Sequence, residues 1–419
     1  MAKAFSAKIK RLIERLNKDI VMLDGGMGTQ IQAKKLTEED YRGERFKDHK
    51  DSLLGNNDLL NLSQKRLIVD IHKDYIASGA QIIGTNTFNS SEPGQDDYKL
   101  SSLVKELNLE AASLARQACE EAISEKKASE LWVAGCLGPT NKTASLSPDV
   151  NDPSFRAIDF DKLYAIYLEQ MKALLEGGVD LFLAETVFDT LNLKACLSAY
   201  QDLMYDRQEK TPMMVSVTIT DLSGRTLSGQ TIEAFWNSIA HAHPFSVGIN
   251  CALGAQEMRP YVRELAKLAD CYISCYPNAG LPDPLSPTGY KESPDDTSGF
   301  LEDFAKEGLV NMLGGCCGTS PEHIKAIKDK CIKYETRKLP ERKNLGLRLS
   351  GLEPFNSKIS DQNFIIVGER TNVTGSPKFR RLIKEEKFDE ALSVAKQQVE
   401  GGANILDVNF DEGLLGSKA

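Results

Sequence analysis

The chain has 419 residues, of which 41% are hydrophobic and 26% are charged, as expected for a globular protein with a substantial core. Its 60 acidic and 51 basic residues leave a formal net charge of −9, which gives no support for binding to nucleic acid or to an anionic membrane. No apolar run approaches the roughly 18–20 residues that span a bilayer. Nine cysteines without an export signal predict reduced thiols in the cytoplasm.

Residues 1–19 are predicted to form a helix that packs on the body of the protein. Their apolar side chains recur at helical spacing: Phe5, Ile9, Leu12, Ile13 and Leu16. This pattern favours an amphipathic helix over a targeting peptide, because the segment lacks the features of a secretory signal.

Residues 20–336 show an alternation of short apolar runs and longer helical patterns. Near-continuous apolar runs are typical of parallel strands that are buried on both faces. The runs cover residues 20–25, 81–86, 132–139, 181–186, 213–219, 245–251, 272–278 and 309–313. The helical patterns cover residues 60–78, 103–126, 161–176, 191–208, 232–241, 255–268 and 321–335. This α/β pattern predicts a (β/α)8 barrel of the TIM type.

The remaining residues are predicted to form a linker and the beginning of a second α/β barrel. The linker covers residues 337–358, which are charged and contain proline. In 359–419, apolar runs at 364–370 and 405–409 predict two strands, and 388–400 predicts a helix. About sixty residues cannot close a barrel of roughly 250 residues. We therefore expect either a piece of a longer protein or a remnant of a second barrel.

Two adjacent cysteines, Cys316 and Cys317, lie between glycines at the end of the eighth predicted strand. Neighbouring cysteines rarely form a disulfide with each other, but both can bind one soft metal ion where the backbone turns sharply. Cys251 ends the sixth strand, and a barrel brings its strand ends to one rim. Three thiolates on Zn²⁺ leave one open position, which is typical of a catalytic site.

The alternative for any cysteine is a small apolar side chain in the core. For Cys251 the two interpretations are equally balanced. The core interpretation suits the remaining cysteines: Cys119, Cys136, Cys196, Cys271, Cys275 and Cys331.

A zinc ion with three thiolates carries a net charge of −1, so it suits the activation of a substrate thiol better than the activation of water. Asp24 and Glu185 end other strands, where they are candidates for binding a substrate ammonium group. A salt bridge or a helix cap is the alternative for both. Asn250 and Asn278 can hydrogen-bond to an amino acid or stabilise a local turn.

These motifs together resemble the N-terminal part of the cobalamin-dependent methionine synthases, over residues 15–415. Two segments, 141–152 and 368–378, favour that family over methyltransferases that use betaine or S-methylmethionine. The resemblance rests on DGGMGT at 24–29, TNTF at 85–88, GPT at 138–140, ETVFDT at 185–190, SGQT at 228–231, GINCALG at 248–254, PNAG at 277–280 and GGCCGTSP at 314–321.

The resemblance implies that Cys251, Cys316 and Cys317 bind zinc and that the thiolate of homocysteine takes the open position. It also implies that Asp24, Glu185 and Asn250 lie near the amino-acid end of homocysteine. The expected reaction transfers a methyl group from methylcobalamin to homocysteine and produces methionine.

The resemblance further implies that residues 359–419 begin a domain that binds 5-methyltetrahydrofolate, with Glu369, Asp407 and Asn409 facing the pterin. A cobalamin-binding module would then act in cis or in trans. Residues 90–96 are more polar than the family pattern, and the rest of the folate barrel and the cobalamin module are absent. The alternatives are a homocysteine methyltransferase that uses betaine or S-methylmethionine, and an inactive fragment that binds zinc.

Overall fold

The computed structural model of the protein describes residues 4–286, 289–341, 346–357 and 364–413. The chain forms two compact units. The first comprises Met1–Lys343 with Leu349–Phe355, and the second comprises Asn344–Arg348 with Asn356–Ala419. The predicted boundary between residues 358 and 359 lies outside the described residues.

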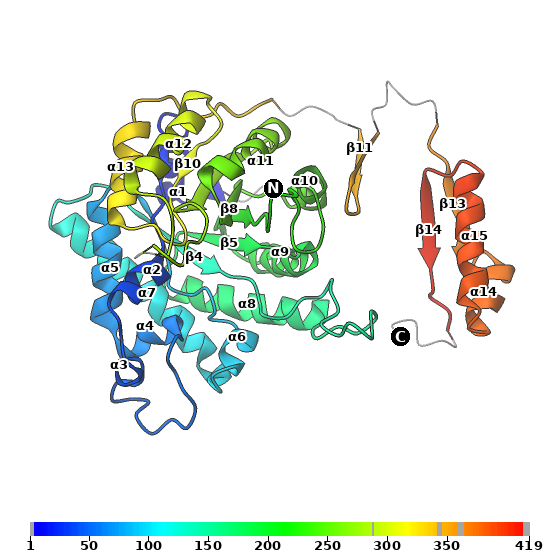
Figure 1. Ribbon diagram of the computed structural model, residues 1–419, viewed down its shortest axis with the longest axis horizontal. Helices are drawn as coiled ribbons and strands as arrows, with labels where there is room; N and C mark the ends of the chain where they lie inside the picture. The colour runs from blue at the N-terminus through cyan, green and yellow to red at the C-terminus, as the bar shows by residue number, and fades with distance from the viewer. Residues whose placement is uncertain (1–3, 287–288, 342–345, 358–363, 414–419) are drawn as a thin grey trace. The chain divides into compact units, whose positions relative to one another are not determined.

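The first unit is built around a closed sheet of parallel strands (Figure 1). Within the described residues, eight strands are hydrogen-bonded side by side, and a parallel bridge between Leu23 and Ile82 joins the two ends of the series. Each predicted run overlaps one strand, so the predicted barrel is confirmed. The order is β2 (Val21–Met22), β10 (Met312–Leu313), β9 (Tyr272–Asn278), β8 (Ser246–Gly254), β7 (Met213–Val217), β5 (Leu181–Val187), β4 (Trp132–Leu137) and β3 (Ile82–Gly84).

Side chains alternate between the inside and the outside of the barrel along each strand. On β5, Leu183 belongs to the cluster inside the barrel, whereas Phe182 and Ala184 pack in the cluster between strands and helices. The next inward position after Leu183 is Glu185. The alternation therefore brings a carboxyl group to the carboxyl end of the barrel, where barrel enzymes have their active sites.

Helices cover the outside of the barrel, as predicted (Figure 1). A helix that the sequence patterns did not indicate, α12, follows β9 and completes the ring. The α-helices after β2 are α2 (Met27–Ala33), α3 (Glu38–Arg42), α4 (Leu60–Ser63), α5 (Lys65–Ala77), α6 (Glu92–Asp96), α7 (Val104–Ser124), α8 (Phe160–Glu176), α9 (Thr190–Tyr205), α10 (Ile232–Ile239), α11 (Ala255–Leu268), α12 (Pro294–Lys306) and α13 (Pro321–Cys331). Short 3₁₀ turns occupy Asn57–Leu59, Ser101–Leu103 and Ala240–Ala242.

The N-terminal helix α1 (Ala7–Leu16) closes the barrel at the end opposite the strand termini that carry the predicted site. Its buried side chains Ile9, Leu12 and Leu16 belong to the cluster inside the barrel, together with Trp132. The indole N–H of Trp132 donates to the carbonyl of Lys8 at 3.1 Å. Before α1, β1 (Ala4–Phe5) pairs with β6 (Glu209–Lys210) in a separate two-stranded sheet.

His72 of α5 makes the stability of the barrel sensitive to acid. Its side chain is buried, and neither ring nitrogen has a hydrogen-bond partner among the described residues. Burial lowers the pKa of His72 from 6.5 to about 4. Between these values the unfolded chain binds a proton that the folded chain excludes, so stability falls as the pH drops from 6.5 to 4.

The wild type should lose unfolding free energy when the pH falls from 7.5 to 5. We expect His72→Leu to lose about 2 kcal/mol less over the same range. Urea unfolding at the two pH values measures this difference. The exposed His241 supplies the matched control, since His241→Leu should leave the acid sensitivity of the wild-type protein in place. An unchanged pH dependence in His72→Leu would contradict the prediction.

The predicted linker contains a hairpin, β11 (Leu347–Ser350) and β12 (Pro354–Ser357), whose tip belongs to the first unit. The side chain of Gln230 donates to the carbonyl of Gly351 at 2.8 Å, and that of Asn237 donates to the carbonyl of Leu349 at 3.2 Å. These contacts attach the hairpin tip to α10 and to the loop before it.

The second unit has the strands and helix that the sequence predicts and one helix more. Parallel strands β13 (Val367–Asn372) and β14 (Ile405–Asn409) are connected through α14 (Pro377–Lys384) and α15 (Phe388–Glu400). A small core holds these elements together; it consists of Val373, Phe379, Leu382, Ile383, Ala391 and Val394.

Candidate active site and metal centre

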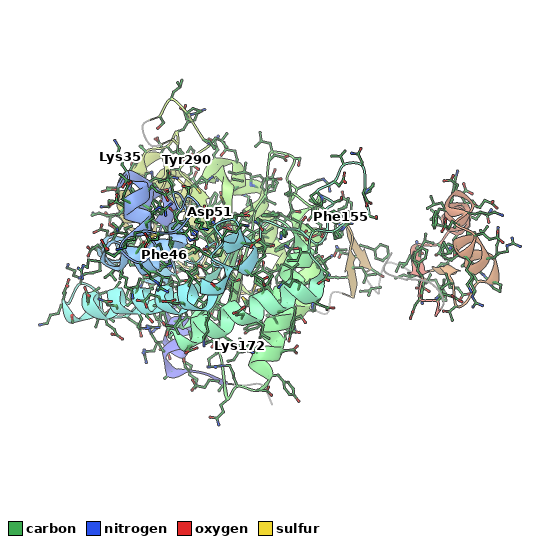
Figure 2. All side chains as sticks on the ribbon, turned by 90° about the horizontal axis from the view of Figure 1, so that it is seen from below. Lys35, Phe46, Asp51, Phe155, Lys172 and Tyr290 are labelled. Atoms are coloured by element: carbon green, nitrogen blue, oxygen red, sulfur yellow. The ribbon has the colours of Figure 1, made fainter. Side chains whose placement is uncertain are left out.

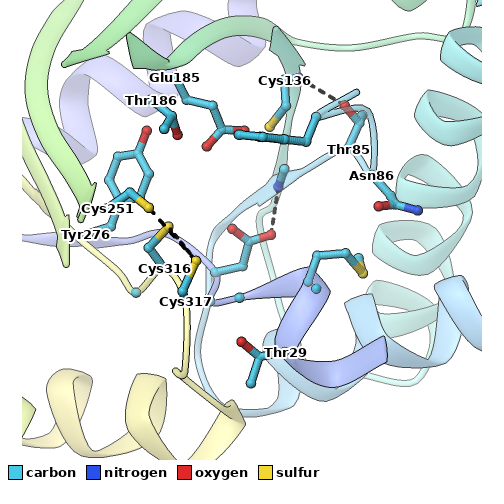
Figure 3. Close-up of a pocket in the computed structure, with 18 of the residues that line it drawn as sticks. Thr29, Thr85, Asn86, Cys136, Glu185, Thr186, Cys251, Tyr276, Cys316 and Cys317 are labelled. Carbon is cyan, nitrogen blue, oxygen red and sulfur yellow. Dashed lines mark hydrogen bonds between the residues drawn. The ribbon is translucent and has the colours of Figure 1, made fainter. Parts of the chain in front are cut away.

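The three cysteines that the sequence singled out meet at the carboxyl end of the barrel (Figure 3). The Sγ atom of Cys317 lies 3.9 Å from that of Cys251 and 3.9 Å from that of Cys316. All three sulfurs lie within 4.8 Å of one another, and all three residues line one cavity. The fold thus brings together residues that are more than sixty positions apart in the sequence.

The spacing of these sulfurs fits a tetrahedral zinc ion. Zinc–sulfur bonds of about 2.3 Å in tetrahedral geometry place the sulfurs about 3.8 Å apart. The observed distances of 3.9 Å agree with that value, and none of the three cysteines is in a disulfide. Cys251, Cys316 and Cys317 would therefore hold the metal.

An irregularity at the end of β8 directs Cys251 toward the other two cysteines. The register between β8 and β9 shifts between Asn250 and Gly254. Cys251 and Ala252 have φ values of 61° and 60°, in the left-handed region that non-glycine residues rarely adopt. Such bulges re-aim side chains next to active sites, and the strained conformation persists only where surrounding contacts hold it.

Cys316 and Cys317 lie in the glycine turn that follows β10. The backbone N–H of Cys316 donates to the carbonyl of Pro277 at 2.8 Å, which ties the turn to the end of β9. Gly318 has a φ of 78°, and a Cβ atom there would lie 2.5 Å from the ring of Tyr290. Glycine therefore allows both the backbone conformation and the close approach of this ring.

A loop at the rim contributes a further side chain to the cavity. Tyr290 comes from the loop between β9 and α12 and lines the cavity beside the cysteines. Tyr290 is labelled in Figure 2, as is the exposed Phe155 of the loop between β4 and α8, which does not line the cavity.

Hydrogen bonds among the thiols favour one thiolate. Bonds from the thiols of Cys251 and Cys316, with a further bond from the hydroxyl of Tyr290, lower the pKa of Cys317 well below the usual range of a thiol. The contacts with Cys251 and Cys317 also raise the pKa of Cys316. The cluster therefore combines one stable thiolate with thiols whose ionisation would be favoured by a bound cation.

Asp24 and Glu185 line the same cavity, which has a volume of about 290 Å³. Burial is the main cause that raises the pKa of each carboxyl group to about 7, and the charge of Glu185 contributes to the raised pKa of Asp24. Asp24 Oδ2 accepts a hydrogen bond from the N–H of Gly84 at 2.8 Å. Neither residue is a helix cap, because Gly26 precedes α2 and Asp189 precedes α9.

Glu185 reaches the cavity through a second irregular strand end. The register between β5 and β7 shifts between Ala184 and Val187, and Thr186 has a φ of 54°. The N–H of Thr186 donates to Asn250 Oδ1 at 3.1 Å, and the amide of Asn250 donates to the Thr186 hydroxyl at 2.9 Å. These two hydrogen bonds stabilise the unusual backbone that directs Glu185 inward.

Asn250 and Asn278, which were predicted to bind the substrate, lie behind the residues that line the cavity, and neither lines it. Asn250 is buried; besides contacting Thr186, it accepts from the Ser216 hydroxyl at 2.7 Å, and its amide lies 4.0 Å from Cys316 Sγ. Asn278 Oδ1 accepts from the N–H of Cys317 at 3.2 Å. In this structure both side chains therefore position the cysteines and Glu185.

Two further cavity residues, Cys136 and Tyr276, were not among the predicted site residues. Cys136 lies inward on β4, where its thiol hydrogen-bonds with the carboxyl group of Glu185. Tyr276 lies inward on β9. The alternation of side chains along a strand could have identified both residues. Cys136 comes two positions after the inward Ala134 on β4, and Tyr276 comes two positions after the inward Ser274 on β9.

The residues predicted to face a pterin lie on the two strands of the second unit. Asp407 accepts a hydrogen bond from the amide of Asn372 at 2.8 Å, and the side chain of Asn409 accepts from the N–H of Asp411 at 2.6 Å. Glu369 lies on β13 and is exposed. In neither unit is a described helix long and apolar enough to cross a membrane.

Comparisons with known proteins place these features in a family. A family model described as homocysteine S-methyltransferase matches residues 21–331, and one described as pterin binding enzyme matches residues 368–418. The crystal structure of the homocysteine methyltransferase MmuM from Escherichia coli in its metallated form has a TM-score of 0.60 and 22% identity, covering 77% of this chain and 99% of that chain. Its oxidized form has a TM-score of 0.60 and 21% identity, covering 78% and 100%.

At this identity the likeness to MmuM shows a shared fold. The first family model, in contrast, covers well over half of the chain and the whole series of barrel strands. The chain therefore belongs to the homocysteine S-methyltransferase family, and it is a methyltransferase.

Proposed function

We propose that the barrel transfers a methyl group to the thiol of homocysteine, which produces methionine, and that Cys251, Cys316 and Cys317 hold a zinc ion for this reaction. One observation carries the proposal: three sulfurs at metal-binding distances and two half-buried carboxyl groups line a single cavity. A zinc ion bound there would lower the pKa of a substrate thiol, so that its sulfur reacts as a thiolate.

The opposite ends of homocysteine match the two kinds of group in the cavity. Its sulfur suits the side with the cysteines, and its ammonium group suits Asp24 and Glu185. Because burial holds the pKa of both carboxyl groups near 7, they release protons readily when a cation arrives. The two carboxyl groups thus carry less negative charge in the empty cavity than when the ammonium group is bound.

The transfer itself is a displacement at the methyl carbon. The new sulfur–carbon bond forms as the bond between the methyl group and its donor breaks, and the electron pair of the broken bond stays with the donor. The chain's contribution is to bind the amino-acid end, to hold the sulfur at the cavity and to restrict access of water, which aligns the sulfur for attack.

For the donor we propose methylcobalamin, recharged from 5-methyltetrahydrofolate. The support comes from the second unit, where residues 368–418 match a pterin-binding family. In this proposal Glu369, Asp407 and Asn409 contribute to the pterin site, and a cobalamin-binding module acts in cis or in trans.

We expect the zinc-loaded protein to convert homocysteine to methionine with free methylcobalamin, and to give at least tenfold less product with S-methylmethionine or betaine. Product formation for each donor is measured by mass spectrometry, and zinc-stripped protein serves as the control. Faster turnover with S-methylmethionine or betaine would overturn the proposed donor. Homocysteine binding without turnover on any donor would indicate a binding module.

A further inference from the structure

The hydroxyl group of Tyr276 has no role in the site described so far. Tyr276 lies on β9 with its ring inside the barrel; only 5% of the residue is exposed, and it lines the cavity. Figure 3 shows the hydroxyl pointing toward the side of the cavity that carries Glu185 and Thr186. This hydroxyl is buried, and it has no hydrogen-bond partner among the described residues.

The polar groups around Tyr276 are already paired with one another. Asn250, which stands beside Tyr276 in the register of β8 and β9, receives a hydrogen bond from Ser216 and exchanges two with Thr186. The thiol of Cys136 contacts the carboxyl group of Glu185. The hydroxyl of Tyr276 therefore lies unpaired beside polar groups that are paired with one another, and the hydroxyl of Ser274, two residues earlier on β9, is unpaired as well among the described residues.

A buried hydroxyl without a partner destabilises a folded protein. Phenylalanine would fill the same space without that penalty, so packing alone does not explain a tyrosine here. The unsatisfied oxygen is instead explained if it gains a partner when the cavity is filled.

A substrate ammonium group supplies such a partner. It carries three N–H donors and therefore needs three acceptors when it is buried. Asp24 and Glu185 provide two of them on the wall of the cavity. We propose that the hydroxyl oxygen of Tyr276 is the third acceptor, which makes Tyr276 part of the site that recognises the α-ammonium group of the substrate. This inference rests on the proposed function.

Tyr276→Phe tests the inference because it removes only the oxygen. We expect the zinc-loaded variant to bind homocysteine roughly 10- to 100-fold more weakly than the wild type, the effect of losing one hydrogen bond to a charged group. Isothermal titration calorimetry measures the dissociation constants. The variant should also unfold at the same temperature as the wild type or a higher one, because the unsatisfied hydroxyl is gone.

Two analogues of homocysteine identify the group that Tyr276 contacts. 3-Mercaptopropylamine keeps the ammonium group and lacks the carboxylate, so the ratio of variant to wild-type dissociation constants should stay at roughly 10 to 100. 4-Mercaptobutanoate keeps the carboxylate and lacks the ammonium group, so that ratio should fall to about one.

Tyr200→Phe is the matched control. Tyr200 is also buried, but its hydroxyl donates to the carbonyl of Thr211 at 2.8 Å and it does not line the cavity. This variant should unfold at a lower temperature and bind homocysteine as the wild type does.

Equal affinity of Tyr276→Phe and wild type for homocysteine would overturn the inference and leave the proposed function intact. A loss that persists with 4-mercaptobutanoate would also overturn it, because the contact would then be to another part of the ligand. If the zinc-loaded wild type did not bind homocysteine, the proposed function itself would fail, and the inference with it.

Discussion

Replacing Cys317 by serine is expected to weaken zinc binding roughly 100- to 1,000-fold. The free energy of zinc binding is typically about 10–16 kcal/mol, and one of four ligands contributes about a quarter of it. Cys317 has the largest expected effect because its sulfur lies 3.9 Å from both other sulfurs. Methyl transfer to homocysteine should fall below detection. Competition with a chromophoric chelator measures the zinc affinity, and circular dichroism reports the fold.

The fold should survive this substitution, because Cys317 lies at the rim of the barrel and belongs to neither core cluster. Cys271→Ser is the matched control: Cys271 does not line the cavity, and its replacement should leave zinc affinity and activity unchanged. Full zinc content in Cys317→Ser would contradict the assigned ligand set. Unfolding of the wild type when zinc is removed would indicate a structural metal instead.

Replacing Glu185 by glutamine is expected to weaken homocysteine binding roughly 100-fold, because in the proposed site the ammonium group loses a half-buried charged partner. The same change should stabilise the empty protein. The pKa of Glu185 is raised from 4.5 to about 7 by burial, so the folded state holds this proton more tightly than the unfolded state does. Stability is therefore lost as the pH rises from 4.5 through 7.

Glutamine keeps the neutral form at every pH, so Glu185→Gln should gain about 3 kcal/mol of unfolding free energy over the wild type at pH 8 and little at pH 4.5. The wild type should bind homocysteine more weakly at pH 6 than at pH 8, because the carboxyl groups must ionise first. Calorimetry and urea unfolding across this range measure both effects. The exposed Glu176 provides the control, since Glu176→Gln should change neither quantity.

Opposite effects on stability and binding are the diagnostic result for Glu185. A purely structural carboxyl group would lose stability when replaced and would not affect the ligand. Weaker binding together with lower stability would contradict the proposed role, as would unchanged affinity.

The barrel was predictable from the sequence because its strands are buried on both faces, which makes each one a recognisable apolar run. Helix α12 was not predicted although it starts with a capping box at Ser293. Its apolar positions are fewer, since Thr297 and Ser298 take part of its buried face. In that segment, hydrophobic periodicity carried less information than the capping residues did.

The adjacent cysteines were recognisable as candidate ligands because glycines mark the turn that presents them. Cys251 was ambiguous from the residues alone. Its orientation depends on an irregularity of β8, and that irregularity is stabilised by Asn250 through contacts with Thr186 on β5 and Ser216 on β7. Local sequence does not report contacts between residues more than thirty positions apart.

The sequence by itself therefore determined the fold, the glycine turn with its two cysteines and the acidic residues at the strand ends, because each depends on short-range patterns of apolar, glycine and charged residues. Only the tertiary structure decided which side chains share the cavity. It placed Asn250 and Asn278 behind the site, and it brought Cys136 and Tyr276 into the cavity. The physical reason is that strand register and two irregular strand ends, both set by contacts across the barrel, determine where each side chain points.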